Sequence, residues 1–301
     1  LVRTMRASFL VLGPLLARAG RARVSLPGGC AIGARSVAPH LHGLAALGAE
    51  IAVREGYVEA SVTRLRGADV LLDMASVTAT ENVMMAAALA EGTTRIANAA
   101  REPEIADLAA LLNAMGARVA GAGNDTITVE GVRALHGARH ALIPDRIEAG
   151  TFLILSLLTG GGLVVQGARR DDLRALEARL TEAGGRGGES PEGLTASAPA
   201  RIRGADVVTQ VHPGFPTDLQ AQWTTLMSLA EGSSAIRETL FENRFQHVPE
   251  LDRMGADITV KGGAAFVRGV PRLTGAPVML SDLRAGALVR AVGDIHSWRS
   301  D

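Results

Sequence analysis

The amino-acid sequence predicts an α/β protein made of a repeated unit, with helices packed inside and sheets outside. Four uncharged apolar segments each run into a glycine, and a second set of glycines ends four amphipathic segments at almost the same spacing. Short β-branched stretches follow both kinds of segment, as expected for strands. The prediction depends on these three observations together.

The uncharged segments are the first of the predicted helices. They end before Gly20, Gly92, Gly160 and Gly232, which are 72, 68 and 72 residues apart, and they span residues 7–17, 82–90, 151–159 and 219–230. A helix that is apolar on every side must be enclosed by protein. The longest of these runs are about half of the ~20 residues that a membrane helix needs, so we expect buried core helices.

A second helix follows each of the first ones. These helices end at Gly48, Gly116, Gly184 and Gly255, which are 68, 68 and 71 residues apart. Glycine is the usual left-handed residue after a helix, because it takes positive φ without a steric cost. With strands expected near residues 93–96, 119, 127–129, 163–165 and 258–260, each unit reads strand, helix, strand, helix, strand, strand, and a fifth unit begins at Ser281. The alternative is a generic α/β protein with accidental spacing.

Composition narrows the possible functions. The 301 residues suffice for two domains, and 47% apolar against 21% charged residues indicates a globular protein. Basic and acidic residues balance at 31 each, and aromatics make up 3%, which disfavours binding to nucleic acid or to an anionic membrane. One cysteine excludes an intramolecular disulfide and a multi-cysteine metal site, and it fits a reducing, cytoplasmic compartment. We expect neither a metal nor a cofactor.

Cys30 is the first candidate for chemistry. A single cysteine is most often a small buried hydrophobe. Here Gly28 and Gly29 precede it and Gly33 follows, a pattern typical of a flexible loop, and Arg35 can stabilise a thiolate or an anionic substrate beside it. A reactive thiol is the better interpretation.

Asp218 is the second candidate, at the entrance to an uncharged helix. Capping by Thr217, with Asp218 favoured by the helix dipole in the first turn, would explain the pair without any function. The functional interpretation places the carboxylate in a crevice between domains, where it can take a proton from a hydroxyl group. The residues alone leave both interpretations open.

Arginines recur near the predicted helix starts and could bind a small anion together. Guanidinium groups match the geometry of phosphate and carboxylate, and helix N-termini favour anions. The alternative for each arginine taken singly is a solvated or salt-bridged surface residue. The four are Arg6, Arg146, Arg244 and Arg284.

Several segments resemble one family closely. The sequence is similar to the UDP-N-acetylglucosamine 1-carboxyvinyltransferases from Leu1 to about Val289. The cysteine loop is specific to this family, because the sister enzyme acting on shikimate 3-phosphate lacks it. The segments that carry the resemblance are residues 4–8, 26–35, 99–105, 144–151, 215–222 and 241–245.

The resemblance implies a two-domain inside-out α/β barrel, the enolpyruvyl transferase fold. The first domain, residues 1–143, would lack its N-terminal repeat and carry the cysteine loop, and the second, residues 144–301, would carry Asp218 and an incomplete last repeat. The implied reaction moves the enolpyruvyl group of phosphoenolpyruvate to the 3-hydroxyl of UDP-N-acetylglucosamine and releases phosphate, which is the first committed step of peptidoglycan synthesis. It implies no cofactor and no obligate protein partner.

The resemblance also implies roles for particular residues. Cys30 would protonate the enolpyruvyl methylene, and Asp218 would take the proton of the sugar hydroxyl. Arg35, Arg244 and Arg284 match positions that hold phosphate or carboxylate, and Arg6 matches one near the UDP-sugar. The positions that would line the nucleotide-sugar site, largely through backbone, are Arg35, Ser36, Val37, Ala38, Pro39, Met74, Ala75, Ser76, Val77 and Leu240.

The chain also departs from the family. It begins with Leu1 and its last helical pattern stops near Trp298, so we expect both ends to be cut. A lysine–asparagine pair and a late arginine that contact phosphoenolpyruvate are therefore missing, and Thr78 stands where glycine is commoner. Two alternatives stay open: the relative that acts on shikimate 3-phosphate, and an inactive remnant that still binds the UDP-sugar.

Overall fold

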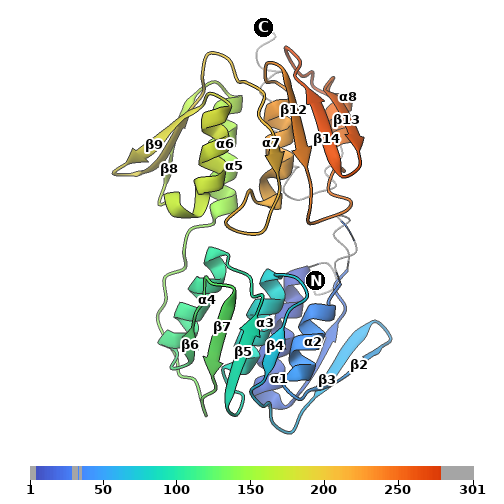
Figure 1. Cartoon of the computed structure of the whole chain (residues 1–301), viewed down its shortest axis with the longest axis vertical. Helices are drawn as coiled ribbons and strands as arrows, with labels where there is room; N and C mark the ends of the chain where they lie inside the picture. The colour runs from blue at the N-terminus through green and yellow to red at the C-terminus, as the bar shows by residue number, and fades with distance from the viewer. Residues whose placement is uncertain (1–4, 29–32, 34–35, 279–301) are drawn as a thin grey trace. The chain divides into compact units, whose positions relative to one another are not determined.

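The computed structural model describes residues 5–28, 33 and 36–278. The chain divides into two compact units between Ile143 and Pro144, except that Gly33 groups with the second unit. We describe each unit by itself (Figure 1). Ser281, where the sequence predicts a fifth repeat, lies outside the described residues.

Unit 1 combines helices with two sheets. Strands β1, β3 and β2 form an antiparallel sheet in that order, and the second sheet has the order β4-β5-β7-β6, with β4 parallel to β5. The elements are η2 (Arg6–Val11), α1 (Leu12–Ala19), β1 (Arg21–Ser25), α2 (Ala38–Ala46), β2 (Glu50–Arg54), β3 (Tyr57–Ser61), β4 (Asp69–Leu71), α3 (Val77–Ala87), β5 (Thr93–Ala97), α4 (Pro103–Ala114), β6 (Arg118–Ala120) and β7 (Thr126–Glu130).

Unit 2 repeats this plan. Its sheets have the orders β8-β10-β9 and β11-β12-β14-β13, and β11 is again parallel to β12. The elements are α5 (Arg146–Leu158), β8 (Gly162–Gln166), η3 (Arg170–Leu173), α6 (Arg174–Glu182), β9 (Arg186–Ser190), β10 (Gly193–Ser197), β11 (Val207–Val208), η4 (Thr217–Leu219), α7 (Gln220–Met227), β12 (Ser233–Arg237), α8 (Val248–Arg253), β13 (Asp257–Lys261) and β14 (Ala264–Arg268).

The predicted repeat is confirmed, with one correction. Two of the repeats, β4-α3-β5-α4-β6-β7 and β11-α7-β12-α8-β13-β14, have the predicted order of strand, helix, strand, helix, strand, strand. The other two repeats lack the first strand among the described residues. Before α5 the reason is visible, because residues 131–145 run from one unit to the other without joining a sheet.

The eight spacing glycines all have positive φ, as predicted. Six of them are the left-handed residue at the end of a helix: Gly20, Gly48, Gly116, Gly160, Gly184 and Gly255. Gly92 and Gly232 are not, because α3 and α7 end earlier, with C-caps at Ala88 and Ser228. These two glycines instead make the turn that leads directly into β5 and β12.

The prediction of enclosed helices is confirmed for α3 and α7. Every residue of α7 is buried, as are seven residues of α3. The first and third apolar segments differ, because Val11 and Leu15 are 46% and 45% exposed in the first and Phe152 is 43% exposed in the third. Within the described part of the chain, the elements that α1 mainly contacts, α3, β1 and η2, leave the Leu15 side of it exposed.

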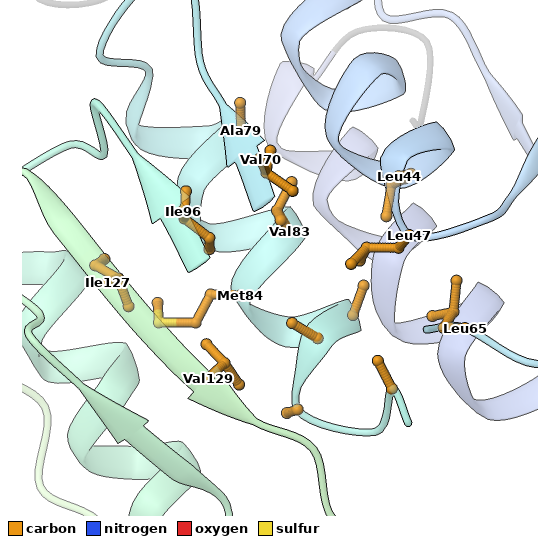
Figure 2. Packing of buried hydrophobic residues seen from close by; sticks show 14 of the residues in the cluster. Leu44, Leu47, Leu65, Val70, Ala79, Val83, Met84, Ile96, Ile127 and Val129 are labelled. Carbon is orange, nitrogen blue, oxygen red and sulfur yellow. The ribbon is translucent and has the colours of Figure 1, made fainter. Parts of the chain in front are cut away.

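Helix α3 lies at the centre of the unit 1 core. Figure 2 shows Met84 of α3 beside Ile127 and Val129 of β7, in one cluster with Val83 and Ile96. Two glycines permit the close approach of the neighbouring helices. A Cβ on Gly13 of α1 would lie 2.3 Å from Asn82 Oδ1, and a Cβ on Gly43 of α2 would lie 2.3 Å from Val83 Cγ2. At these two points the backbones of α1 and α2 therefore pack directly against side chains of α3.

Candidate functional site

The candidate residues in the described part of the chain form two groups, one in each unit. The unit 1 group comprises Arg6, the segment 36–39 and the segment 74–77, and the unit 2 group comprises Asp218, Leu240 and Arg244. Cys30, Arg35 and Arg284 lie outside the described residues.

In unit 1 the two candidate segments lie at the starts of neighbouring helices. Ser36 is exposed, and its Oγ accepts a hydrogen bond of 3.0 Å from the backbone N–H of Ala38 at the start of α2. Ser76 is the N-cap of α3, and its Oγ accepts from the N–H of Ala79 at 3.4 Å. A serine at such a position satisfies a backbone donor that the helix leaves unpaired. Met74, just before this cap, is 51% exposed.

A buried polar group joins these helix starts. His40 directly follows Pro39, and its Nε2 lies 3.2 Å from Oγ1 of Thr78, which directly follows Val77. Its Nδ1 lies 3.0 Å from Nδ2 of Asn82 in α3. Burial, together with the positive charge of Arg6, lowers the pKa of His40 to about 4. His40 is therefore neutral at physiological pH. Because the charge of Arg6 acts on His40, Arg6 lies near the same helix starts.

Glu81, one turn beyond Val77 in α3, titrates in an unusual range. Burial raises its pKa to about 7, and the negative charges of Glu104 and Glu102 add to the shift. Because this pKa exceeds that of an unfolded glutamate, the folded chain binds the proton more tightly. The resulting stabilisation is complete below about pH 4.5 and is lost as the pH rises through about 7.

We therefore expect Glu81→Gln to flatten this dependence, since glutamine stays neutral. Above pH 8 the variant should exceed the wild-type free energy of unfolding by about 1–3 kcal/mol, and near pH 4.5 the advantage should vanish. Urea unfolding at several pH values measures the difference between the two chains. Parallel pH profiles for the two proteins would show that Glu81 is not perturbed.

In unit 2, Asp218 and Arg244 form an ion pair. Arg244 Nη2 donates to Asp218 Oδ1 at 2.6 Å, across 26 positions of the sequence. Arg244 is 5% exposed and Asp218 is 39% exposed. A charge-assisted contact of this length fixes the carboxylate. The other oxygen, Oδ2, has no hydrogen-bond partner within residues 5–28, 33 and 36–278, so one face of the carboxylate is open to a proton donor.

A second carboxylate, that of Glu238, is connected to the Asp218–Arg244 pair through Thr217. Thr217 Oγ1 accepts from Arg244 Nη1 at 3.0 Å and donates to Glu238 Oε2 at 2.8 Å. The other oxygen of Glu238 accepts the backbone N–H groups of Leu240 at 2.9 Å and Phe241 at 3.2 Å. The Arg244 guanidinium also lies 5.3 Å from the centre of the Phe241 ring. This network fixes the backbone of the candidate residue Leu240 relative to Asp218.

The interpretation of Thr217 as a helix cap is wrong. Thr217 makes no capping hydrogen bond, because a 3-10 turn, η4, precedes α7 and Pro216 takes the N-cap position. Its hydroxyl is used instead by Arg244 and Glu238. Asp218 does lie in the first turn, as expected.

Four polar side chains of these two groups were not among the sequence candidates. They are His40, Asn82, Thr217 and Glu238. A signal existed for Asn82, which opens the uncharged apolar segment 82–90 and, if that segment is enclosed, needs buried partners. Glu238 offers a weaker signal, an acidic residue that directly follows strand β12.

Together the side chains of unit 2 combine a partly exposed carboxylate with a buried, fixed guanidinium. A carboxylate in this position can accept a proton, and a guanidinium beside it holds negative charge in place.

Among the described residues, no helix has the length and apolar character to cross a membrane.

The fold defines a class of protein, the enolpyruvyl transferases. The structure matches the enolpyruvyl transferase NikO from Streptomyces tendae with a TM-score of 0.82 and 26% identity, over 95% of this chain and 70% of that one. It also matches EPSP synthase from Acinetobacter baumannii with a TM-score of 0.69 and 19% identity, over 95% of this chain and 70% of that one. The second likeness concerns the fold alone.

The sequence specifies the family further. Residues 1–295 match the EPSP synthase family, described as 3-phosphoshikimate 1-carboxyvinyltransferase. A UDP-N-acetylglucosamine 1-carboxyvinyltransferase of Acidiphilium cryptum is 59% identical over 95% of this chain and 68% of its own length. One of Myxococcus xanthus is 54% identical over 100% of this chain and 72% of its own length. The chain belongs to the EPSP synthase family, within its group of UDP-N-acetylglucosamine 1-carboxyvinyltransferases.

Proposed function

We propose that this chain transfers the enolpyruvyl group of phosphoenolpyruvate to the 3-hydroxyl of UDP-N-acetylglucosamine and releases phosphate. The observation that carries the proposal is the 52–59% identity to relatives named UDP-N-acetylglucosamine 1-carboxyvinyltransferase. The Asp218–Arg244 pair supports it with a proton acceptor beside a fixed positive charge. The product commits the sugar nucleotide to peptidoglycan synthesis.

The proposed chemistry proceeds in two stages. In the first, the sugar 3-oxygen bonds to C2 of phosphoenolpyruvate while its proton passes to Asp218, and the methylene carbon gains a proton from Cys30. In the second, the C2–O bond to phosphate breaks, the methyl carbon returns a proton to the Cys30 thiolate, which restores the double bond, and the proton held by Asp218 leaves with the phosphate. Arg244, Arg35 and Arg284 would hold the carboxylate and the departing phosphate.

The residues proposed to contact the nucleotide-sugar are Arg6 and the segments 36–39 and 74–77 in unit 1. In unit 2, Leu240 is proposed to contact it. Residues 1–143 and 144–301 would be the two domains of the enzyme. A reducing cytoplasmic compartment is part of the proposal, because Cys30 has to remain a thiol to act as an acid.

Phosphate release in the presence of both substrates tests this proposal. We expect release that requires phosphoenolpyruvate and UDP-N-acetylglucosamine together and that does not occur when shikimate 3-phosphate replaces the sugar nucleotide. Release with phosphoenolpyruvate and shikimate 3-phosphate, but not with phosphoenolpyruvate and the sugar nucleotide, would overturn the assigned acceptor. Saturable binding of the UDP-sugar without any release would instead indicate a binding remnant.

A further inference from the structure

One chain of buried and partly buried hydrogen bonds connects η2, which begins with Arg6, to the residues that directly follow the candidate segments 36–39 and 74–77. We infer that His40 and Thr78 are positioning residues, whose hydrogen bond holds the segment 36–39 against the segment 74–77 and thereby sets the affinity for the nucleotide-sugar. The inference rests on the proposed function for the identity of the ligand.

Asn82 fixes the buried end of this chain. Its Oδ1 accepts the backbone N–H of Gly13 at 2.6 Å, and its Nδ2 donates to the carbonyl oxygen of Phe9 at 3.1 Å. The same Nδ2 lies 3.0 Å from Nδ1 of His40. Asn82 is fully buried, so its orientation is determined by these partners. It therefore connects η2, which begins with Arg6, to α2 and α3.

The partners of His40 decide where its ring proton lies. The Asn82 amide nitrogen can only donate, so His40 Nδ1 accepts and the proton of the neutral ring is on Nε2. Nε2 then donates to Thr78 Oγ1 at 3.2 Å. Because burial keeps the pKa of His40 near 4, this donor persists throughout the neutral range. The ring also packs edge-on against Phe9, with 5.1 Å between the ring centres, which restricts its rotation.

The position of this hydrogen bond gives it a role in binding. His40 is adjacent to Pro39 in sequence and Thr78 is adjacent to Val77, so the bond links the two candidate segments within one residue of each. Segments that bind a ligand largely through backbone need their separation fixed in advance, because any freedom lost on binding weakens affinity. Without the bond, the two segments would be held relative to each other only by the packing of α2 on α3 and by the Asn82–His40 contact, which lies deeper in α3.

The test compares two substitutions of Thr78 that differ in the hydroxyl group. Thr78→Val keeps the shape and removes the acceptor, and we expect the Kd and the KM for UDP-N-acetylglucosamine to rise about threefold to tenfold, with kcat within about twofold of wild type. Thr78→Ser keeps the acceptor, and its affinity should stay within about twofold of the wild-type value. Calorimetric titration measures Kd for each variant.

Thr80→Val is the matched control. Thr80 also lies in α3 and is fully buried, but its hydroxyl accepts the N–H of Ala100 at 3.0 Å and does not lead to either segment. This variant should lose stability without losing affinity. Equal affinity for Thr78→Val and wild type, or an equal loss in Thr80→Val, would overturn the positioning role.

A measurement without ligand examines the hydrogen bond itself. Long-range proton–nitrogen NMR spectra should show His40 protonated on Nε2 alone between pH 6 and 8, with the Nε2 proton shifted in Thr78→Val. Protonation on Nδ1 would overturn the inference whatever the binding results. If the wild-type chain gave the expected spectrum but bound no UDP-sugar, the geometry would stand, whereas the proposed function and the role in binding would both fail.

Discussion

Replacing Asp218 with asparagine should lower kcat for phosphate release by at least about 100-fold. General acid–base catalysis typically contributes 10²–10⁴-fold, and asparagine cannot accept the proton of the sugar hydroxyl. The amide oxygen of asparagine can still accept the hydrogen bond of 2.6 Å from Arg244, so the site should keep its shape. The Kd for UDP-N-acetylglucosamine should therefore change little. Steady-state kinetics and calorimetric titration of the same preparation measure both quantities.

The matched control for this experiment is Asp206→Asn. Asp206 lies in the same unit, and its exposed carboxylate accepts the backbone N–H of Ala235 at 2.7 Å, a bond that an amide oxygen can also make. This variant should retain wild-type kcat. An Asp218→Asn variant with more than about a tenth of wild-type turnover would show that another group accepts the proton.

Replacing Trp223 with alanine should lower the free energy of unfolding of unit 2 by about 3–5 kcal/mol. Trp223 is fully buried in α7, donates its indole N–H to the carbonyl oxygen of Ala205 at 3.2 Å and packs edge-on against Phe215, with 5.7 Å between the ring centres. Truncation removes the buried surface, leaves a cavity and orphans a buried carbonyl group. Phe215 leads directly into η4, so catalysis should decline along with stability.

Urea unfolding followed by circular dichroism measures this effect, because the substitution removes one of the two tryptophans of the chain and fluorescence would not be comparable between the two proteins. If the two units unfold in separate transitions, the loss should appear in one of them only. Phe266→Ala is the comparison, since that ring is 50% exposed on β14 and its loss should cost less than about 1 kcal/mol. A loss below about 1 kcal/mol for Trp223→Ala would mean that α7 does not anchor unit 2.

The fold could be predicted well because its repeat depends on local rules. Positive φ at Gly48, Gly116 and Gly184 follows from the need to end a helix, and that need is visible in sequence. The roles of Gly92 and Gly232 could not be separated from capping, since a glycine that opens a strand has the same local pattern as one that closes a helix. The exposed face of α1 depends on which neighbours it packs against, and hydrophobic pattern does not specify neighbours.

The candidate site was predictable only in part. Asp218 stood out by its place before an uncharged helix, but its pairing with Arg244 arises from tertiary packing across 26 positions. The contact between His40 and Thr78 is likewise long-range, and each residue alone looks like an ordinary helix residue. Cys30, the candidate with the clearest loop pattern, lies outside the described residues and stays a prediction.

Identification of the product by mass spectrometry and NMR tests the central claim most directly. The account predicts that the purified chain, given phosphoenolpyruvate and UDP-N-acetylglucosamine, forms the sugar nucleotide with an enolpyruvyl ether on its 3-oxygen and one phosphate for each ether. A chain that binds the UDP-sugar yet leaves it unmodified, or one that adds the enolpyruvyl group to shikimate 3-phosphate instead, would contradict it.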